Sequence, residues 1–197
     1  MPCGTALFTY KEEFYMSGTY AEIKRIDRKL IYSGKVIDYY QDTMALPDGG
    51  TTLWDYIDHD GAAAIVAVRD DGKILMVRQY RNTAQRAMLE IPAGKKNDRS
   101  EDPAACAARE LEEETGYRAL RLERMTMIYP SVAYCGETID LYLARDLTPA
   151  SQHLDEDEYI NVEAYSLREL TDMILSGEID DAKTICGILM YRAMNGN

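Results

Sequence analysis

The sequence predicts an α/β sandwich preceded by a small antiparallel β part. From about residue 62 onward, short strand-like segments are mixed with two or three helical segments and joined by long loops. The residues from about 22 to 58 have strand-like patterning without a helical period. At 197 residues the chain has the length of one domain with an appendage. We therefore expect an N-terminal β subdomain in residues 1–58 and a main domain in residues 59–197.

The composition argues against several function classes. The chain has 34 acidic and 22 basic side chains, a formal net charge of −12, whereas binding to nucleic acid or to an anionic membrane needs basic patches. The longest apolar stretch, residues 61–68, is too short to span a membrane, and the N-terminus has no signal-peptide pattern. Only two histidines, His59 and His153, are available for a histidine-based triad or metal cage.

The cysteines favour neither a zinc site nor a disulfide framework, because no CxxC pair is present. Free thiols fit a reducing compartment, so we expect a cytoplasmic protein. The four scattered cysteines are Cys3, Cys106, Cys135 and Cys186.

The N-terminal part is predicted to contain a hairpin. Residues 35–40 alternate partly between apolar and polar side chains, Pro47-Asp-Gly-Gly50 is a turn signal, and residues 51–57 form the returning strand. A hairpin this small cannot hold a core alone. We therefore expect it to pack on the main domain or on a second copy of the chain.

The main domain begins with two strands joined by a tight turn. Residues 62–68 have the pattern of a buried strand, and residues 73–81 form the next one after a turn at 70–72. Alternation at the end of this second strand places Arg81 on the face opposite Tyr80.

Three helices and two further strands follow. Asp102, Pro103 and Gly116 are the N-cap, first-turn and C-terminal signals of a helix over residues 103–115. A capping box at Ser166 opens a second helix that ends at Gly177. The remaining segments are strands at 125–129 and 138–144 and a last helix at 181–193.

The helix at 103–115 carries three carboxylates on one face. Glu110, Glu113 and Glu114 stand at positions i, i+3 and i+4, and their mutual repulsion favours a bound cation. Closely spaced oxygen ligands suit Mg²⁺ or Mn²⁺ better than zinc. Taken alone, the triplet is better explained by a solvated acidic helix face.

The spacing around this helix resembles the Nudix box, the signature of the Nudix hydrolase family, written G-x5-E-x7-R-E-U-x-E-E-x-G-U with U an apolar residue. The matching residues are Glu101, Arg109, Glu110, Leu111, Glu113, Glu114, Gly116 and Tyr117. Six residues instead of five separate Gly94 from Glu101, so we expect the extra residue to loop out ahead of the helix. The resemblance implies a Nudix α/β/α sandwich with a mixed sheet.

The resemblance also implies roles for the box residues. In this family the box holds divalent metal against a diphosphate, so the implied cofactor is Mg²⁺, with Mn²⁺ as a substitute. Glu110 and Glu114 would be the main metal ligands, and Glu113 would be a further ligand with a part in catalysis. Arg109 would orient the glutamates, a structural as well as a catalytic role, and Glu101 would steady the box.

The flanking segments look like the ADP-ribose pyrophosphatase branch of the family. The similar stretches are residues 77–81, 89–94 and 176–185. In that branch the carbonyl at the Ala93 position is a metal ligand, and the arginine at the Arg81 position contacts the substrate's phosphates or its terminal ribose.

Further residues of the branch's substrate site are matched less closely. The N-terminal β part implies a domain-swapped homodimer, in which it helps to form the partner's adenosine pocket. Trp54 would stack on adenine or belong to the dimer interface, and Asp55 takes the place of a glutamate of the branch. Glu137 would bind metal or ribose, although the proline that usually follows Ser131 stands instead at Pro130.

Residues 154–158 resemble the mobile acidic loop that supplies the catalytic base. Glu156 is the first candidate for the base, and Glu158 is an alternative base or a metal ligand. A solvated acidic loop is the other explanation for this charge run.

The predicted function is Mg²⁺-dependent hydrolysis of the diphosphate bond of ADP-ribose, giving AMP and ribose 5-phosphate, or of a related nucleoside diphosphate sugar. Two enzymatic alternatives are preference for ADP-glucose or for GDP-mannose. A third alternative is a Nudix protein that senses ADP-ribose without cleaving it, although such proteins usually lose box glutamates.

Overall fold

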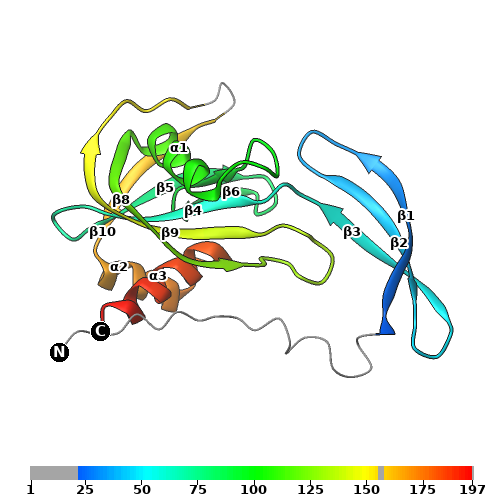
Figure 1. Cartoon of the computed structure of the whole chain (residues 1–197). Helices are drawn as coiled ribbons and strands as arrows, with labels where there is room; N and C mark the ends of the chain where they lie inside the picture. Colours follow the sequence, from blue (N-terminus) through cyan, green and yellow to red (C-terminus); the bar gives the residue numbers. More distant parts are fainter. Residues whose placement is uncertain (1–21, 155–157, 197) are drawn as a thin grey trace, which may run out of the picture. The chain divides into compact units, whose positions relative to one another are not determined.

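The computed structural model describes residues 22–154 and 158–196 (Figure 1). The chain forms two compact units, which divide between Ile57 and Asp58. Each unit is described by itself.

The N-terminal unit is a three-stranded sheet in the order β1-β2-β3, with β1 antiparallel to β2. The strands span Lys24–Ser33 (β1), Asp38–Ala45 (β2) and Thr51–Asp58 (β3). The predicted turn closes between the last two strands, where the amide of Leu46 donates to the carbonyl of Gly50 at 2.9 Å.

Arg28 ties the three strands of this sheet together. Its guanidinium pairs with Asp42 through two hydrogen bonds of 2.6 Å and lies 4.0 Å from the centre of the Tyr56 ring. Asp42 is buried, and the hydrogen bond from Arg28 lowers the pKa of its carboxyl.

The second unit is built on a seven-stranded mixed sheet. Its strands are β4 (Ala62–Val68), β5 (Ile74–Arg81), β6 (Arg86–Glu90), β7 (Ala93–Lys95), β8 (Tyr117–Ile128), β9 (Ile139–Pro149) and β10 (Ile160–Tyr165). The main path runs β10-β5-β4-β9-β8, with β6 paired to β5 and β7 paired to β4. Strands β4 and β9 are parallel, and the other pairs with a determined register in this sheet are antiparallel.

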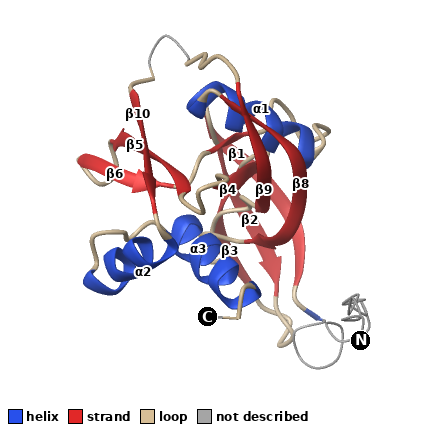
Figure 2. Cartoon of the chain, turned by 90° about the vertical axis from the view of Figure 1, so that its left-hand side faces the viewer, coloured by secondary structure: helices blue, strands red, loops and turns tan. Residues whose placement is uncertain are grey.

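Helices cover both faces of this sheet, which makes the unit an α/β/α sandwich as predicted (Figures 1 and 2). Helix α1 (Pro103–Thr115) packs on one face, and helices α2 (Leu167–Ser176) and α3 (Ala182–Met194) pack on the other. Strand β4 contributes side chains to the hydrophobic cores on both faces of the sheet, because successive side chains of a strand point to opposite faces. Ala63, Ile65 and Ala67 contact the α1 side, whereas Ala62, Ala64 and Val66 contact the α2–α3 side.

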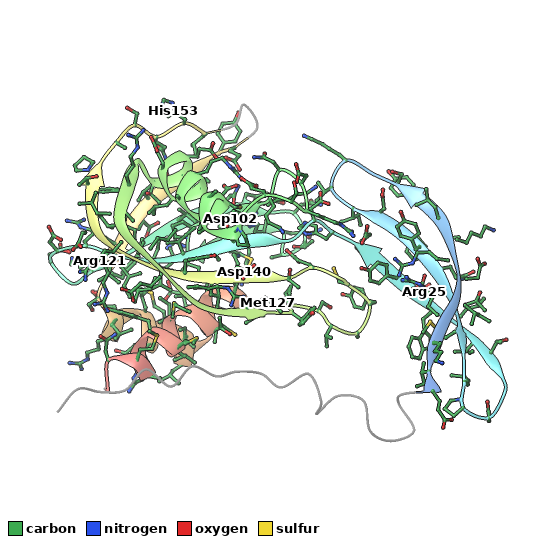
Figure 3. All side chains as sticks on the ribbon, in the orientation of Figure 1. Arg25, Asp102, Arg121, Met127, Asp140 and His153 are labelled. Atoms are coloured by element: carbon green, nitrogen blue, oxygen red, sulfur yellow. The ribbon has the colours of Figure 1, made fainter. Side chains whose placement is uncertain are left out.

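The helix boundaries follow the capping signals of the sequence. Asp102, labelled in Figure 3, accepts hydrogen bonds from the amides of Ala104 and Ala105 at 2.7 and 3.1 Å. Gly116 ends α1 in the left-handed conformation, with φ of 71°, which glycine adopts without steric cost. The capping box at Ser166 is also present.

The sequence reading missed several strands. Strand β8 begins at Tyr117, directly after the α1 cap, instead of near residue 125. It is an edge strand with mostly exposed or half-exposed side chains, so its polar sequence lacks the apolar run that marks a buried strand. The short strands β6, β7 and β10 were not predicted as separate elements. None of the helices in the described part of the chain is long and apolar enough to cross a membrane.

Candidate active site

The acidic face of α1 is turned into the protein. Glu110 and Glu114 are 9% and 3% exposed, whereas Glu112 lies on the other side and pairs with Arg118 at 2.6 Å. A solvated acidic face would leave all of these carboxylates in water. The burial of Glu110 and Glu114 therefore excludes that explanation of the triplet.

Strand β7 brings its backbone against these two carboxylates. The amide of Ala93 donates to Oε2 of Glu114 at 2.9 Å. A Cβ atom at Gly94 would lie 2.0 Å from the carboxyl carbon of Glu110, so only glycine leaves room for that side chain. Close packing against Glu110 thus explains why position 94 is a glycine. This holds although Gly94 stands one residue further from Glu101 than the box pattern specifies.

Arg109 links the carboxylates to one another. Its Nη1 donates to Glu110 at 2.6 Å and to Glu113 at 2.9 Å, and its Nη2 donates to the carbonyl of Lys95 at 3.1 Å. Nε lies 3.3 Å from Glu101. The guanidinium therefore contacts three carboxylates and the β7 backbone at once.

The extra residue before the helix lies in a small polar turn. The amide of Ser100 donates to Oδ1 of Asp98 at 2.7 Å, and the amide of Asn97 donates to Oε2 of Glu101 at 2.6 Å. With this turn, Glu101 still lies within hydrogen-bonding distance of Arg109 although the segment is one residue longer than the box pattern.

Burial perturbs the two innermost carboxyl groups. Desolvation is the main reason why the pKa of Glu110 is raised to about 7 and that of Glu114 to about 8. The nearby Arg109 lowers the pKa of Glu110, and the amide of Ala93 lowers that of Glu114, but neither offsets the effect of burial. A divalent cation bound here would neutralise the negative charge of these two buried carboxylates.

Within residues 22–154 and 158–196, no group of three or more histidine, cysteine, aspartate or glutamate side chains is already arranged to hold a metal ion. Nη1 of Arg109 donates to both Glu110 and Glu113. A metal ion bound by these glutamates would have to compete with Arg109 for their oxygens.

Glu158, the last residue of the predicted acidic loop, lies near the same site. Glu158 is half-buried, and its charge raises the pKa of both Glu110 and Glu114, so it lies close to both groups. Glu156 lies outside the described residues.

A cleft of about 300 Å³ opens beside β7. Three of the residues predicted to bind metal or substrate line it, Arg81, Ala93 and Glu137, together with the box residue Gly94. Its walls also include His59, Lys95, Pro130, Asp181 and Lys183. Trp54 and Asp55 belong to the N-terminal unit, where Trp54 is about half exposed and Asp55 accepts a hydrogen bond from the Tyr39 hydroxyl at 2.5 Å.

A buried carboxylate, Glu90, anchors one wall of the cleft. Arg81 donates to it through Nε at 2.7 Å and through Nη2 at 2.8 Å, and Lys183 donates to it through Nζ. Burial alone would raise the pKa of Glu90, but the hydrogen bond from Arg81 and the charge of Lys183 lower it below its ordinary value. Glu90 is therefore an anion held between two cations.

A family model, the NUDIX domain, matches residues 58–187. The chain belongs to the Nudix family. It is 41% identical to the ADP-ribose pyrophosphatase of Bacillus subtilis over 169 residues, which cover 85% of this chain and 91% of the relative. It is 37% identical to the methanol dehydrogenase activator of Bacillus methanolicus, over 87% of this chain and 93% of that protein. A solved ADP compounds hydrolase superposes with a TM-score of 0.77 at 18% identity, covering 88% and 94% of the two chains.

Sequence reasoning missed three residues near this Nudix site. Cys106 lies within the box segment on the buried side of α1, and burial raises the pKa of its thiol to about 11, which favours the protonated thiol. His59 accepts a hydrogen bond at Nδ1 from the amide of Gly61 at 3.0 Å, which leaves Nε2 as its donor. His59 stands in no recognised motif. Lys183 belongs to the stretch 176–185 that looks like the branch, but only the cleft places both side chains beside the site.

Proposed function

We propose that this Nudix protein is a divalent-metal-dependent pyrophosphohydrolase that cleaves the diphosphate bond of ADP-ribose or a related nucleoside diphosphate sugar. The observation that carries the proposal is the buried pair Glu110 and Glu114, packed against the β7 backbone at the edge of a cleft that contains Arg81. The relative from Bacillus subtilis supports ADP-ribose as the first substrate to test. The products would be AMP and ribose 5-phosphate.

The donor set fits Mg²⁺, with Mn²⁺ as a substitute. The carboxylates of Glu110 and Glu114 and the carbonyl of Ala93 are all oxygen donors, which hard cations prefer. Glu113, which shares Arg109 with Glu110, and Glu137, which lines the cleft, are further candidate ligands. When bound, the cations would neutralise the diphosphate oxygens and lower the pKa of the attacking water.

The chain's own residues would position the reactants. Arg109 would hold the box glutamates in place through its hydrogen bonds to Glu110 and Glu113. Arg81 would bind the phosphates or the terminal ribose through the N–H groups that Glu90 leaves unused. Glu156 or Glu158 would accept the proton of the attacking water, and the nearness of Glu158 to the box supports the second of these.

We also propose that the N-terminal sheet completes the site as part of a homodimer. Its described strands and turns expose many large apolar side chains, as a surface covered by a second copy would. Trp54 would stack on adenine or lie in that interface, and Asp55 would border the same pocket. The exposed residues are Ile26, Leu30, Ile31, Tyr32, Val36, Ile37, Leu53 and Trp54. Light scattering coupled to size exclusion should give the mass of two chains.

The cytoplasm is the compartment we propose. The three cysteines of the described region, Cys106, Cys135 and Cys186, are free thiols, which a reducing compartment maintains.

The deciding experiment is AMP release from ADP-ribose with Mg²⁺, beside ADP-glucose and GDP-mannose. Glu113→Gln should lower turnover at least about 100-fold. Glu112→Gln is the matched control, because it makes the same change one residue away on the outward face and should leave turnover unchanged.

Faster cleavage of ADP-glucose or GDP-mannose than of ADP-ribose would leave the proposed mechanism unchanged. It would show that the pocket recognises a different nucleoside diphosphate sugar. Tight binding of ADP-ribose without turnover would support the sensing alternative. Full activity of Glu113→Gln would contradict the role given to Glu113.

A further inference from the structure

We propose that Lys183 is a substrate-binding residue that contacts a phosphate of the diphosphate group, and that Glu90 positions it together with Arg81. This inference rests on the proposed function, because it assigns a further binding residue to the same cleft. Lys183 lies in the first turn of α3 and Arg81 at the end of β5, so the two cations come from distant parts of the chain.

Glu90 lies behind these two cations. Its side chain is 2% exposed, whereas those of Lys183 and Arg81 are 12% and 36% exposed. Both cations line the cleft, and Glu90 does not. The buried carboxylate therefore fixes the position of two positive groups on the cleft wall.

The hydrogen bonds leave donors available for an anion. An ammonium group has three N–H donors, and Lys183 directs two of them to Glu90 and to Asp181, the second at 3.1 Å. A guanidinium has five donors, and Arg81 uses two of them on Glu90. One ammonium and three guanidinium N–H groups are then left for a bound group, a set that matches the several acceptor oxygens of a diphosphate.

The neighbours of the cleft support a phosphate in this position. Ala93 and Gly94 line the same cleft, and their backbone packs against Glu114 and Glu110. A diphosphate held at these carboxylates by cations would have Lys183 and Arg81 along the adjoining wall. The carboxylates alone would repel it.

A purely structural role for Lys183 is the competing explanation, since it joins α3 to the end of β6. A second bond makes that connection without the lysine, because the hydroxyl of Thr184 accepts a hydrogen bond from the amide of Ile91 at 3.0 Å. The start of α3 is also capped locally, by Asp181 accepting from the amide of Thr184 at 2.9 Å. The lysine is therefore not the sole attachment of the helix.

The test uses the full chain and an analogue of ADP-ribose in which a methylene group replaces the bridging oxygen. Titration calorimetry with Mg²⁺ should show that Lys183→Met weakens binding about 10- to 100-fold, as loss of a charge-assisted hydrogen bond does. Lys183→Arg keeps the charge and should recover most of the affinity. Lys73→Met, an equal change of charge at an exposed turn, should bind as the unaltered protein does.

Steady-state kinetics supply the second readout. Lys183→Met should raise KM for ADP-ribose, whereas a residue that only seats α3 would lower the melting temperature and leave KM unchanged. If Lys183→Met does not fold, Lys183→Gln replaces it, because the amide can still donate to Glu90 and Asp181.

A folded Lys183→Met or Lys183→Gln variant with unchanged affinity and unchanged KM would overturn the inference. If the unaltered protein neither binds the analogue nor cleaves ADP-ribose, the proposed substrate fails. Inorganic pyrophosphate with Mg²⁺ then replaces the analogue in the calorimetry. Pyrophosphate binding that is lost in Lys183→Met would still support the lysine as a diphosphate ligand, and binding that is absent or independent of Lys183 would overturn it.

Discussion

Replacing Gly94 with alanine would place a methyl group in the space that the Glu110 carboxylate occupies. The added Cβ would lie 2.0 Å from the carboxyl carbon and 2.1 and 2.2 Å from its oxygens. Ordinary contact begins at 3.4 Å, so the carboxyl group must move by about 1.4 Å. Glu110 is also held by Arg109 at 2.6 Å, and the displacement would therefore disturb the whole box.

A shift of this size should affect activity more than stability. Misplacement of a catalytic group by about 1 Å can cost about 100-fold in rate, so we expect Gly94→Ala to lower kcat by about that factor. Overpacking should lower the free energy of unfolding by about 1 to 3 kcal/mol. For a chain of this size each kcal/mol lowers Tm by about 2 to 4 °C. The assays are AMP release with Mg²⁺ and thermal unfolding.

Gly72→Ala is the matched control for this prediction. Gly72 has φ of +78° and no heavy atom within 4 Å of an added Cβ, so alanine there costs of order 1 kcal/mol through backbone strain alone. It should lower Tm to a similar extent and leave kcat unchanged. A Gly94→Ala variant with the kcat of the unaltered protein would refute the reasoning, because it would show that the position of Glu110 does not matter for catalysis.

Two further predictions concern the charge of the box. The pKa values of Glu110 and Glu114 are raised to about 7 and about 8. Between about pH 4.5 and 8 the folded protein without metal therefore binds more protons than the unfolded chain. Its free energy of unfolding should fall as the pH rises through that window. Thermal unfolding in EDTA should show this fall, and the gain in Tm from Mg²⁺ should grow from pH 5 to pH 8; a gain independent of pH would contradict the assignment of these groups as ligands. Arg109→Met removes the cation from the buried carboxylates and should destabilise the metal-free protein by about 3 kcal/mol. Mg²⁺ should restore part of that loss in Tm, and a loss that is the same with and without Mg²⁺ would show that repulsion between the carboxylates is not its cause.

Much of the fold followed from local signals in the chain. Asp102 and Gly116 bound α1 because a carboxylate at the N-cap and a left-handed glycine at the C-terminus satisfy the helix ends locally. The strand over residues 62–68 was predicted because an unbroken apolar run suits a strand buried on both faces. The edge strand β8 lacks such a run, so its first half was missed.

The sequence by itself determined the residues of the Nudix box and their spacing along one helix face, because the helical period alone places Glu110, Glu113 and Glu114 together. It could not determine whether that face is solvated. Tertiary packing decided this, since β7 covers Glu110 and Glu114, and desolvation by neighbouring elements is what raises their pKa values. Tertiary structure alone also joined Arg81, Glu90 and Lys183, because residues 93 positions apart meet only when α3 packs against the end of β6.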